Sequence, residues 1–260
     1  MKVLVVIPAR YASSRFPGKP LALLKGADGR ALTLIERTWN TAQNISAVSS
    51  VVATDDDRIA TEVRRFGGEV KMTPSSCKNG TERCAAVLAQ LGDTFDLVVN
   101  LQGDAPLTPP WFVDDLISAM AGDEKIEVAT PILACSPEML SALRGDRLAG
   151  RVGATTVVRD RLGNALYFSK EVLPFGADAQ TRAFHHVGVY AYRPTALGLY
   201  SDWSEAPLER VEGLEQLRFL ENGMPIRCVE VDAKTRSFWE LNNPEDVSKI
   251  ETMMKKMGVN

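Results

Sequence analysis

Three cationic side chains and two serines follow the first apolar run of the chain. The stretch "IPARYASSRFPGKPL" comes directly after "VLVV" and contains Arg10, Arg15 and Lys19. These residue types suit a polyphosphate, because backbone N–H groups bind its oxygens while arginine forks and a lysine point charge offset its negative charge. The alternative is a solvated connection whose charges face water, although the loop is longer than the usual connection of about two to six residues.

Carboxylates follow two other apolar runs. Asp104 stands in "NLQGDAPL", beside a glycine. A carboxylate there reaches a hard Mg²⁺ ion that also binds phosphate oxygens and water, but it equally suits a turn or a helix N-cap. Asp55, Asp56 and Asp57 precede "RIATEV", where aspartates favour helix capping over a metal site.

The elements that must position these side chains alternate between strand and helix. Short runs rich in valine and isoleucine predict strands, and amphipathic stretches between them predict helices. This alternation is typical of a mainly parallel sheet, in which ligands bind beyond the carboxyl ends of the strands. The predicted strands are 2–7, 48–54, 68–72, 96–102 and 128–133, and the predicted helices are 32–42, 57–66, 81–91 and 109–120.

The pattern changes after about residue 134. Strand-like segments with a turn signal at "RDRLGN" predict a β-rich lobe at about 150–193, within a single domain spanning 1–260. A helical pattern follows over 208–223 and stops at Asn222 and Gly223.

Composition narrows the class of protein. Hydrophobic residues make up 45% and charged residues 24% of the 260 positions, and the net charge is −3. These values are ordinary for a globular protein, and without a basic field we expect no nucleic-acid partner. The four cysteines lack a zinc-like spacing, so we expect reduced thiols. No apolar run approaches a membrane span or a signal peptide, which predicts a cytoplasmic protein with no membrane partner.

The opening loop resembles the signature of one enzyme family, whereas a P-loop and a G-x-G-x-x-G motif are absent. The CMP-Kdo synthetases (3-deoxy-manno-octulosonate cytidylyltransferases) open with P-A-R-Y-x-S-x-R-x-P-G-K-P-L, which this chain matches from Pro8 to Leu21. Segments such as "NGTERCA", "ALYFSK" and "HHVGVYAYR" also correspond. The resemblance implies a nucleotide-diphospho-sugar transferase fold: α/β, with a mainly parallel central sheet flanked by helices and a smaller β-rich dimerisation lobe in a homodimer.

The resemblance also implies a reaction. CTP and an acidic 2-keto sugar, Kdo foremost, would give a CMP-sugar and pyrophosphate for lipopolysaccharide or surface polysaccharide synthesis. Arg10, Lys19 and Asp104 would be catalytic, with Asp104 binding Mg²⁺. Arg83 would bind nucleotide, although it equally suits an ordinary helix-surface charge. The full nucleotide-binding set would be Arg10, Ser13, Arg15, Lys19, Asn79, Gly80, Thr81, Arg83 and Gln102.

The sugar side is implied by the second half of the chain. Lys170 stands where the family usually has arginine, and either side chain pairs with a carboxylate, although only arginine does so as a fork. His185 is expected to be an ordinary half-buried residue, and a polar helix face stays open as the alternative for Glu212. The sugar-binding set would be Lys170, His186, Tyr190, Glu215 and Gln216.

Two further positions depart from the family pattern. Asn242 stands where the family has a second metal-binding aspartate, and Ala105 where it has glutamate. The Asn242 amide oxygen would still bind Mg²⁺ with one negative charge fewer, or it would only support the N-cap at Asn243 of a last helix predicted over 243–258. Two alternatives therefore stay open: CMP activation of a different ulosonic or nonulosonic acid, and a catalytically weak nucleotide-binding homologue.

Overall fold

The chain builds one unit, continues into a second and returns to the first. The first unit combines Met1–Asp114 with Ala233–Asn260, and the second is Asp115–Asp232. The computed structural model describes residues 1–13, 15–46, 48–92, 94–151, 154–178, 182–234, 236, 241 and 243–260.

Parallel strands form the centre of the first unit. Side by side they run β5 (Val70–Met72), β4 (Val48–Thr54), β1 (Val3–Ala9) and β6 (Leu97–Asn100). Every side chain from Val3 to Ile7 is at most 5% exposed. Strands covered on both faces are apolar throughout, which is why these runs were recognisable in the sequence. The predicted α/β class with a mainly parallel central sheet is confirmed.

Helices follow the strands of this unit as predicted. They are α1 (Leu34–Gln43), α2 (Asp57–Arg65) and α3 (Gly80–Leu91), and α4 (Pro110–Gly122) leads into the second unit. Thr33, Asp56 and Asn79 each accept a hydrogen bond from a backbone N–H of the first turn that follows. Such N-caps fix where a helix begins and therefore where the preceding loop ends.

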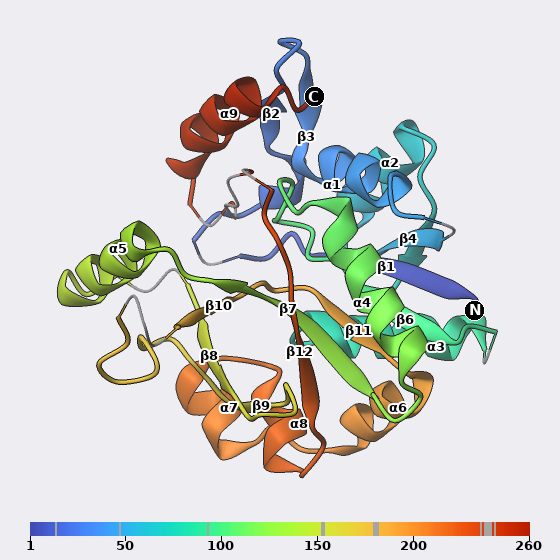
Figure 1. Ribbon diagram of the computed structural model, residues 1–260. Helices are drawn as coiled ribbons and strands as arrows, with labels where there is room; N and C mark the ends of the chain where they lie inside the picture. The colour runs from blue at the N-terminus through green and yellow to red at the C-terminus, as the bar shows by residue number, and fades with distance from the viewer. Residues whose placement is uncertain are drawn as a thin grey trace. The chain divides into compact units, whose positions relative to one another are not determined.

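The last helix was predicted from the sequence, whereas the small hairpin beside it was not. The hairpin joins β2 (Leu23–Lys25) to β3 (Ala31–Thr33), and α9 (Asp246–Met257) lies beside it in Figure 1. Leu24, Ile250 and Met254 belong to one buried cluster that joins them. No helix within the described ranges is long and apolar enough to cross a membrane.

The second unit has a mixed sheet around β7 (Val128–Ala134). β12 (Ile226–Glu230) pairs with one edge of it in parallel, and two antiparallel strands pair with the two ends of its other edge. The remaining strands are β8 (Thr156–Arg159), β9 (Ala165–Ser169), β10 (Phe184–His186) and β11 (Tyr190–Tyr192). The helices are α5 (Pro137–Leu148), α6 (Pro194–Asp202), α7 (Pro207–Glu212) and α8 (Leu217–Glu221).

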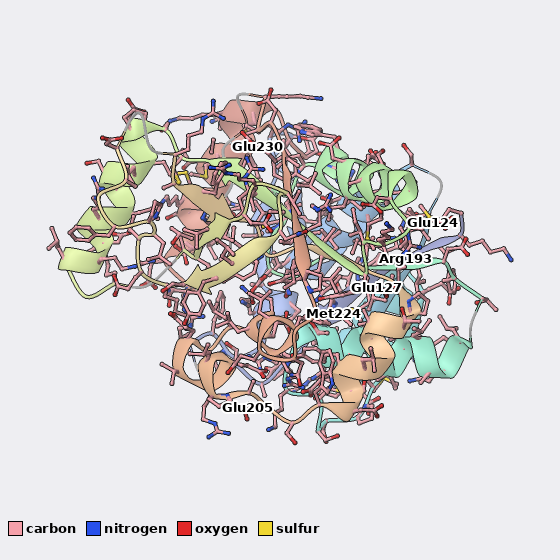
Figure 2. The ribbon with its side chains drawn as sticks, turned by 60° about the horizontal axis from the view of Figure 1, so that its bottom comes forward. Glu124, Glu127, Arg193, Glu205, Met224 and Glu230 are labelled. Atoms are coloured by element: carbon pink, nitrogen blue, oxygen red, sulfur yellow. The ribbon has the colours of Figure 1, made fainter. Side chains whose placement is uncertain are left out.

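A backbone hydrogen bond and a buried ion pair stabilise this unit. Arg193, at the start of α6, donates its backbone N–H to the Glu127 carbonyl at 2.8 Å, and Figure 2 shows the two residues side by side. Arg218 forms a buried ion pair with Glu209 at 2.7 Å. The prediction of one helix over 208–223 is wrong, because Gly213 adopts a left-handed conformation (φ 62°) and separates α7 from α8.

Candidate functional site

The order of the parallel strands creates a place for a ligand. From β1 the chain passes to β4 and β5 on one side, and β6 then pairs with β1 on the other side. Loops therefore leave the carboxyl ends of β1 and β6 in opposite directions, and such a switch point opens a crevice at the edge of the sheet. The cationic loop and the "QGD" segment are the loops at this point.

Hydrogen bonds within the cationic loop hold its conformation. Gly18 donates its N–H to the Tyr11 carbonyl at 2.9 Å, and Phe16 donates its N–H to the Ser13 hydroxyl at 3.3 Å. Gly18 has φ 70°, which side chains disfavour, and the ring of Tyr11 is already 3.0 Å from where a Cβ would lie. Arg10 and Arg15 are exposed, one at the end of β1 and the other within the loop.

An ion pair joins the two loops. Lys19 Nζ lies 2.6 Å from Asp104 Oδ2, and the two side chains are 15% and 28% exposed. A cation and a carboxylate that are 85 residues apart in sequence thus meet at the switch point. The convergence expected from the carboxyl ends of parallel strands is present.

Gly103 explains how Asp104 comes so close. A Cβ at Gly103 would lie 2.6 Å from the Pro8 carbonyl oxygen, so only glycine lets this loop pack against the end of β1. Thr38 of α1 donates its hydroxyl to the Gly103 carbonyl at 3.2 Å. Leu241 donates its N–H to the Asp104 carbonyl at 2.9 Å. The Asp104 backbone is therefore held from several sides.

The "NGTER" residues form the start of α3. Asn79 is its N-cap, accepting from the Glu82 N–H at 2.8 Å, and Thr81 is fully buried. A Cβ at Gly80 would lie 3.2 Å from Gln102 Nε2, so the structure brings these two predicted nucleotide-binding residues together. Backbone N–H groups at a helix start are suitable donors to an anion.

Arg83 is not a helix-surface charge. It is 3% exposed and donates to the Thr73 hydroxyl at 2.6 Å and to Asp55 Oδ2 at 3.0 Å. The structure thus excludes the surface alternative. It also corrects the view of the aspartates: Asp56 caps α2, whereas Asp55 pairs with Arg83.

Asn100 was missed by sequence reasoning. It ends β6, is fully buried, and neither its Nδ2 nor its Oδ1 has a hydrogen-bond partner in the described part of the protein. Buried amides without partners are uncommon and call for a physical explanation. The signal available in the sequence was a polar residue at the end of an apolar strand, two positions before Gln102.

In the second unit, His186 and Tyr190 lie together. Their ring centroids are 5.4 Å apart, and His186 Nε2 is 3.0 Å from the Thr130 hydroxyl. Both residues are buried, with exposed fractions of 6% and 3%. His185 is buried as well, more deeply than the half-buried position expected for it.

Glu212 has a specific role in joining α7 to β9. It accepts hydrogen bonds from the Ser169 hydroxyl at 2.7 Å, from the Lys170 N–H at 3.0 Å and from the Tyr167 hydroxyl at 3.3 Å. Glu212 is therefore half-buried and joined to β9 rather than free on a helix face. Lys170 Nζ is 3.0 Å from where a Cβ of Gly213 would lie, so this ammonium rests on the turn after α7.

Glu215 and Gln216 lie between α7 and α8. The Glu215 carbonyl accepts from the Tyr200 hydroxyl at 3.2 Å. Gln216 is 2% exposed, and its Nε2 has no hydrogen-bond partner among the described residues. Whether these residues bind a sugar stays a prediction.

Acid should destabilise the protein through the two histidines. Burial lowers the pKa of His185 to about 4 and that of His186 to about 3, and the charge of the neighbouring His185 contributes to the lowering at His186. The unfolded chain takes up protons below pH 6.5 while the folded chain does not, so folding stability falls as the pH falls towards 4. We expect a loss of about 2–4 kcal/mol in the free energy of unfolding between pH 7 and pH 5. Urea denaturation at both pH values measures it.

The control for this measurement is a His185→Gln/His186→Gln variant, which should show a clearly smaller pH dependence. Equal slopes in the variant and the unmodified protein would mean that neither imidazole is held neutral.

The donor set at the switch point fits a metal that shares its coordination with a nucleotide. Asp104 supplies one accessible carboxylate, and Mg²⁺ in nucleotide sites is held by one or two carboxylates together with phosphates and water. Among the described residues, no group of three or more His, Cys, Asp or Glu side chains could hold a metal ion. The other predicted metal ligand, Asn242, lies outside the described residues.

Comparisons with known proteins agree with one another. The profile of a family described as cytidylyltransferase matches residues 4–226. A 3-deoxy-manno-octulosonate cytidylyltransferase of Maricaulis maris is 43% identical and covers 99% of both chains. A mitochondrial one of Arabidopsis thaliana is 36% identical over 99% of this chain and 85% of its own.

A solved structure agrees with them. It is a CMP:2-keto-3-deoxy-manno-octonic acid synthetase complexed with CTP, which is 34% identical with a TM-score of 0.85 and covers 99% of this chain and 100% of its own. The family profile, the curated relatives and the solved structure lead to one conclusion: this chain belongs to the 3-deoxy-manno-octulosonate cytidylyltransferase family of nucleotidyltransferases.

Proposed function

We propose that this protein transfers the cytidylyl group of CTP to Kdo, releasing CMP-Kdo and pyrophosphate for lipopolysaccharide or surface polysaccharide synthesis. The observation that carries the proposal is the Lys19–Asp104 ion pair at the switch point. It brings together a cation that would neutralise phosphate and a carboxylate that would bind magnesium, two functions that nucleotidyl transfer uses.

The first unit would bind CTP. Arg10, Arg15 and Lys19 would neutralise the β- and γ-phosphates, and Gln102 with the first turn of α3 would hold the nucleoside. The anomeric oxygen of the sugar forms the new bond to the α-phosphorus as the bond to the β-phosphate oxygen breaks, and the hydroxyl proton is lost to solvent or a nearby base. Asp104 and Asn242 would hold Mg²⁺, which when bound would supply charge neutralisation at the phosphate oxygens.

Arg83 would act on this site by positioning. Its ion pair with Asp55 and its bond to Thr73 tie α3 to the ends of β4 and β5. The first turn of α3 is therefore fixed relative to the sheet before any ligand arrives, which lowers the cost of ordering it later.

The second unit would bind the acidic sugar. Lys170 would pair with its carboxylate, and Tyr190, Glu215 and Gln216 would contact its hydroxyls. His186 would do so as a neutral imidazole, because burial lowers its pKa to about 3.

Pyrophosphate release tests the proposal. We expect release only when CTP, Mg²⁺ and Kdo are present together, with ATP, GTP and UTP much poorer donors. A panel of other ulosonic and nonulosonic acids, ranked by kcat/KM, checks the acceptor. A higher kcat/KM with another acid would mean that this acid, and not Kdo, is the acceptor. CTP binding without turnover, with turnover restored by Asn242→Asp, would instead indicate a catalytically weak homologue.

We also propose that the working form is a homodimer. β9 is the last strand in the sheet order of its unit, and it carries Leu166, which is 63% exposed. Phe175, shortly after β9, is fully exposed. Exposed apolar side chains beside a strand edge favour pairing with a second copy. Sedimentation velocity at micromolar concentration should show a dimer, and a Leu166→Glu variant should be largely monomeric. A cytoplasmic location stays a prediction.

A further inference from the structure

Asn100 carries a carboxamide that the fold leaves unpaired. It is fully buried at the end of β6, and neither polar atom of its side chain has a hydrogen-bond partner in the described ranges. Folding removes this amide from water and returns no hydrogen bond, which costs free energy. A leucine of nearly the same shape would avoid the cost, so the amide needs another reason to be there.

The position of Asn100 supplies that reason. A Cβ at Gly80 would lie 2.7 Å from Asn100 Nδ2, 3.3 Å from its Oδ1 and 3.2 Å from Gln102 Nε2. Two carboxamides from the end of β6 thus meet at the first residue of α3, and no side chain stands between them and the helix start. Asn79 adds the N-cap of the same helix.

We propose that Asn100 is a specificity-determining residue that reads the pyrimidine base of the bound nucleotide. The inference rests on the proposed function, because it requires CTP to be the substrate. The pairing edge of cytosine presents an amine donor next to a ring-nitrogen acceptor, and a carboxamide presents an acceptor next to a donor. The two edges are complementary, so a small side-chain movement that admits the base would pair both amide atoms. Because Gly80 has no Cβ, no side chain of its own separates the Asn100 amide from the start of α3.

The test uses Asn100→Leu in the full chain, because leucine has the same branching without polar atoms. Calorimetry measures the affinities for CTP and for pyrophosphate, which lacks a base, and differential scanning measures Tm. We expect CTP affinity to fall about tenfold or more while pyrophosphate affinity stays within about twofold. Tm should rise, since an unpaired buried amide has been removed. The control is Asn40→Leu, on the exposed face of α1, which should change neither affinity.

Opposite changes in Tm and CTP affinity are the signature of a ligand-reading group. An unchanged CTP affinity would overturn the proposal, and so would a parallel loss of CTP affinity, pyrophosphate affinity and Tm, which indicates a structural role. Gly80→Ala is the second variant should the leucine protein not fold: its methyl group would crowd Asn100 Nδ2 and should lower CTP affinity but not pyrophosphate affinity. Failure of the proposed function is distinguishable: the unmodified protein would then either not bind CTP or bind it without releasing pyrophosphate, whereas failure of this inference leaves CTP binding by the unmodified protein intact.

Discussion

Asp104→Asn should lower kcat/KM for CTP by about 100- to 1,000-fold, the range typical of losing one preorganised electrostatic group. The substitution keeps the shape of the side chain and removes its charge. Asparagine still offers an oxygen to Mg²⁺, but the negative charge that Asp104 places next to Lys19 is lost. Pyrophosphate release under saturating Kdo measures the effect, and a higher Mg²⁺ requirement should accompany it.

The matched control is Asp57→Asn, an exposed carboxylate in the first turn of α2. It should keep activity within about twofold of the unmodified protein and lose only a little helix stability. If Asp104→Asn retained full activity at low Mg²⁺ concentration, Asp104 would not be the metal ligand.

Lys19→Met should change two affinities in opposite directions. In the free protein the Lys19 ammonium lies 2.6 Å from Asp104 Oδ2 and is only 15% exposed, so it occupies the place where a cation would bind. Removing it should raise the affinity for Mn²⁺ without nucleotide by about tenfold, which corresponds to about 1.4 kcal/mol. Removing it should also weaken CTP binding and lower kcat/KM by about 100-fold, because a phosphate-neutralising charge is lost.

Electron paramagnetic resonance of free Mn²⁺ gives the first affinity and calorimetry gives the second. Lys25→Met is the control, since Lys25 is an exposed residue of β2. If Lys19→Met bound Mn²⁺ no better than the unmodified protein, the lysine would not compete with the metal for Asp104.

Much of the fold could be predicted because its signals are local. The apolar runs of β1, β4 and β6 are buried on both faces, and the caps Asp56 and Asn79 mark their helices in the sequence itself. The predicted helix over 208–223 failed for a reason that is not local. Gly213 follows Glu212, which bonds to β9, and tertiary contacts of this kind override helical periodicity.

The hairpin of β2 and β3 was not predicted for a similar reason. Each strand has three residues, too few for a periodic signal, and the hairpin is held from far along the chain. Lys25 donates its N–H to Glu251 at 2.8 Å, and Ala27 donates its N–H to the Val259 carbonyl at 2.9 Å.

The candidate site likewise contains residues that the sequence could place together and residues that it could not. Lys19 and Asp104 could be placed together because parallel strands bring their carboxyl ends to one edge. The partner of Arg83 could not, since Asp55 lies 28 residues earlier and nothing in the sequence links them. In the sequence Asn100 looks like one more residue of an apolar strand. Only the structure shows that its side-chain amide is buried next to Gly80 without a hydrogen-bond partner among the described residues.

A crystal structure with CTP and Mg²⁺, but without sugar, tests the central claim most directly. We predict that Lys19 Nζ leaves Asp104 and binds a phosphate oxygen, while Asp104 and the phosphates share a magnesium ion at about 2.1 Å. CTP bound away from the ends of β1 and β6, with the 2.6 Å ion pair between Lys19 and Asp104 intact, would contradict it.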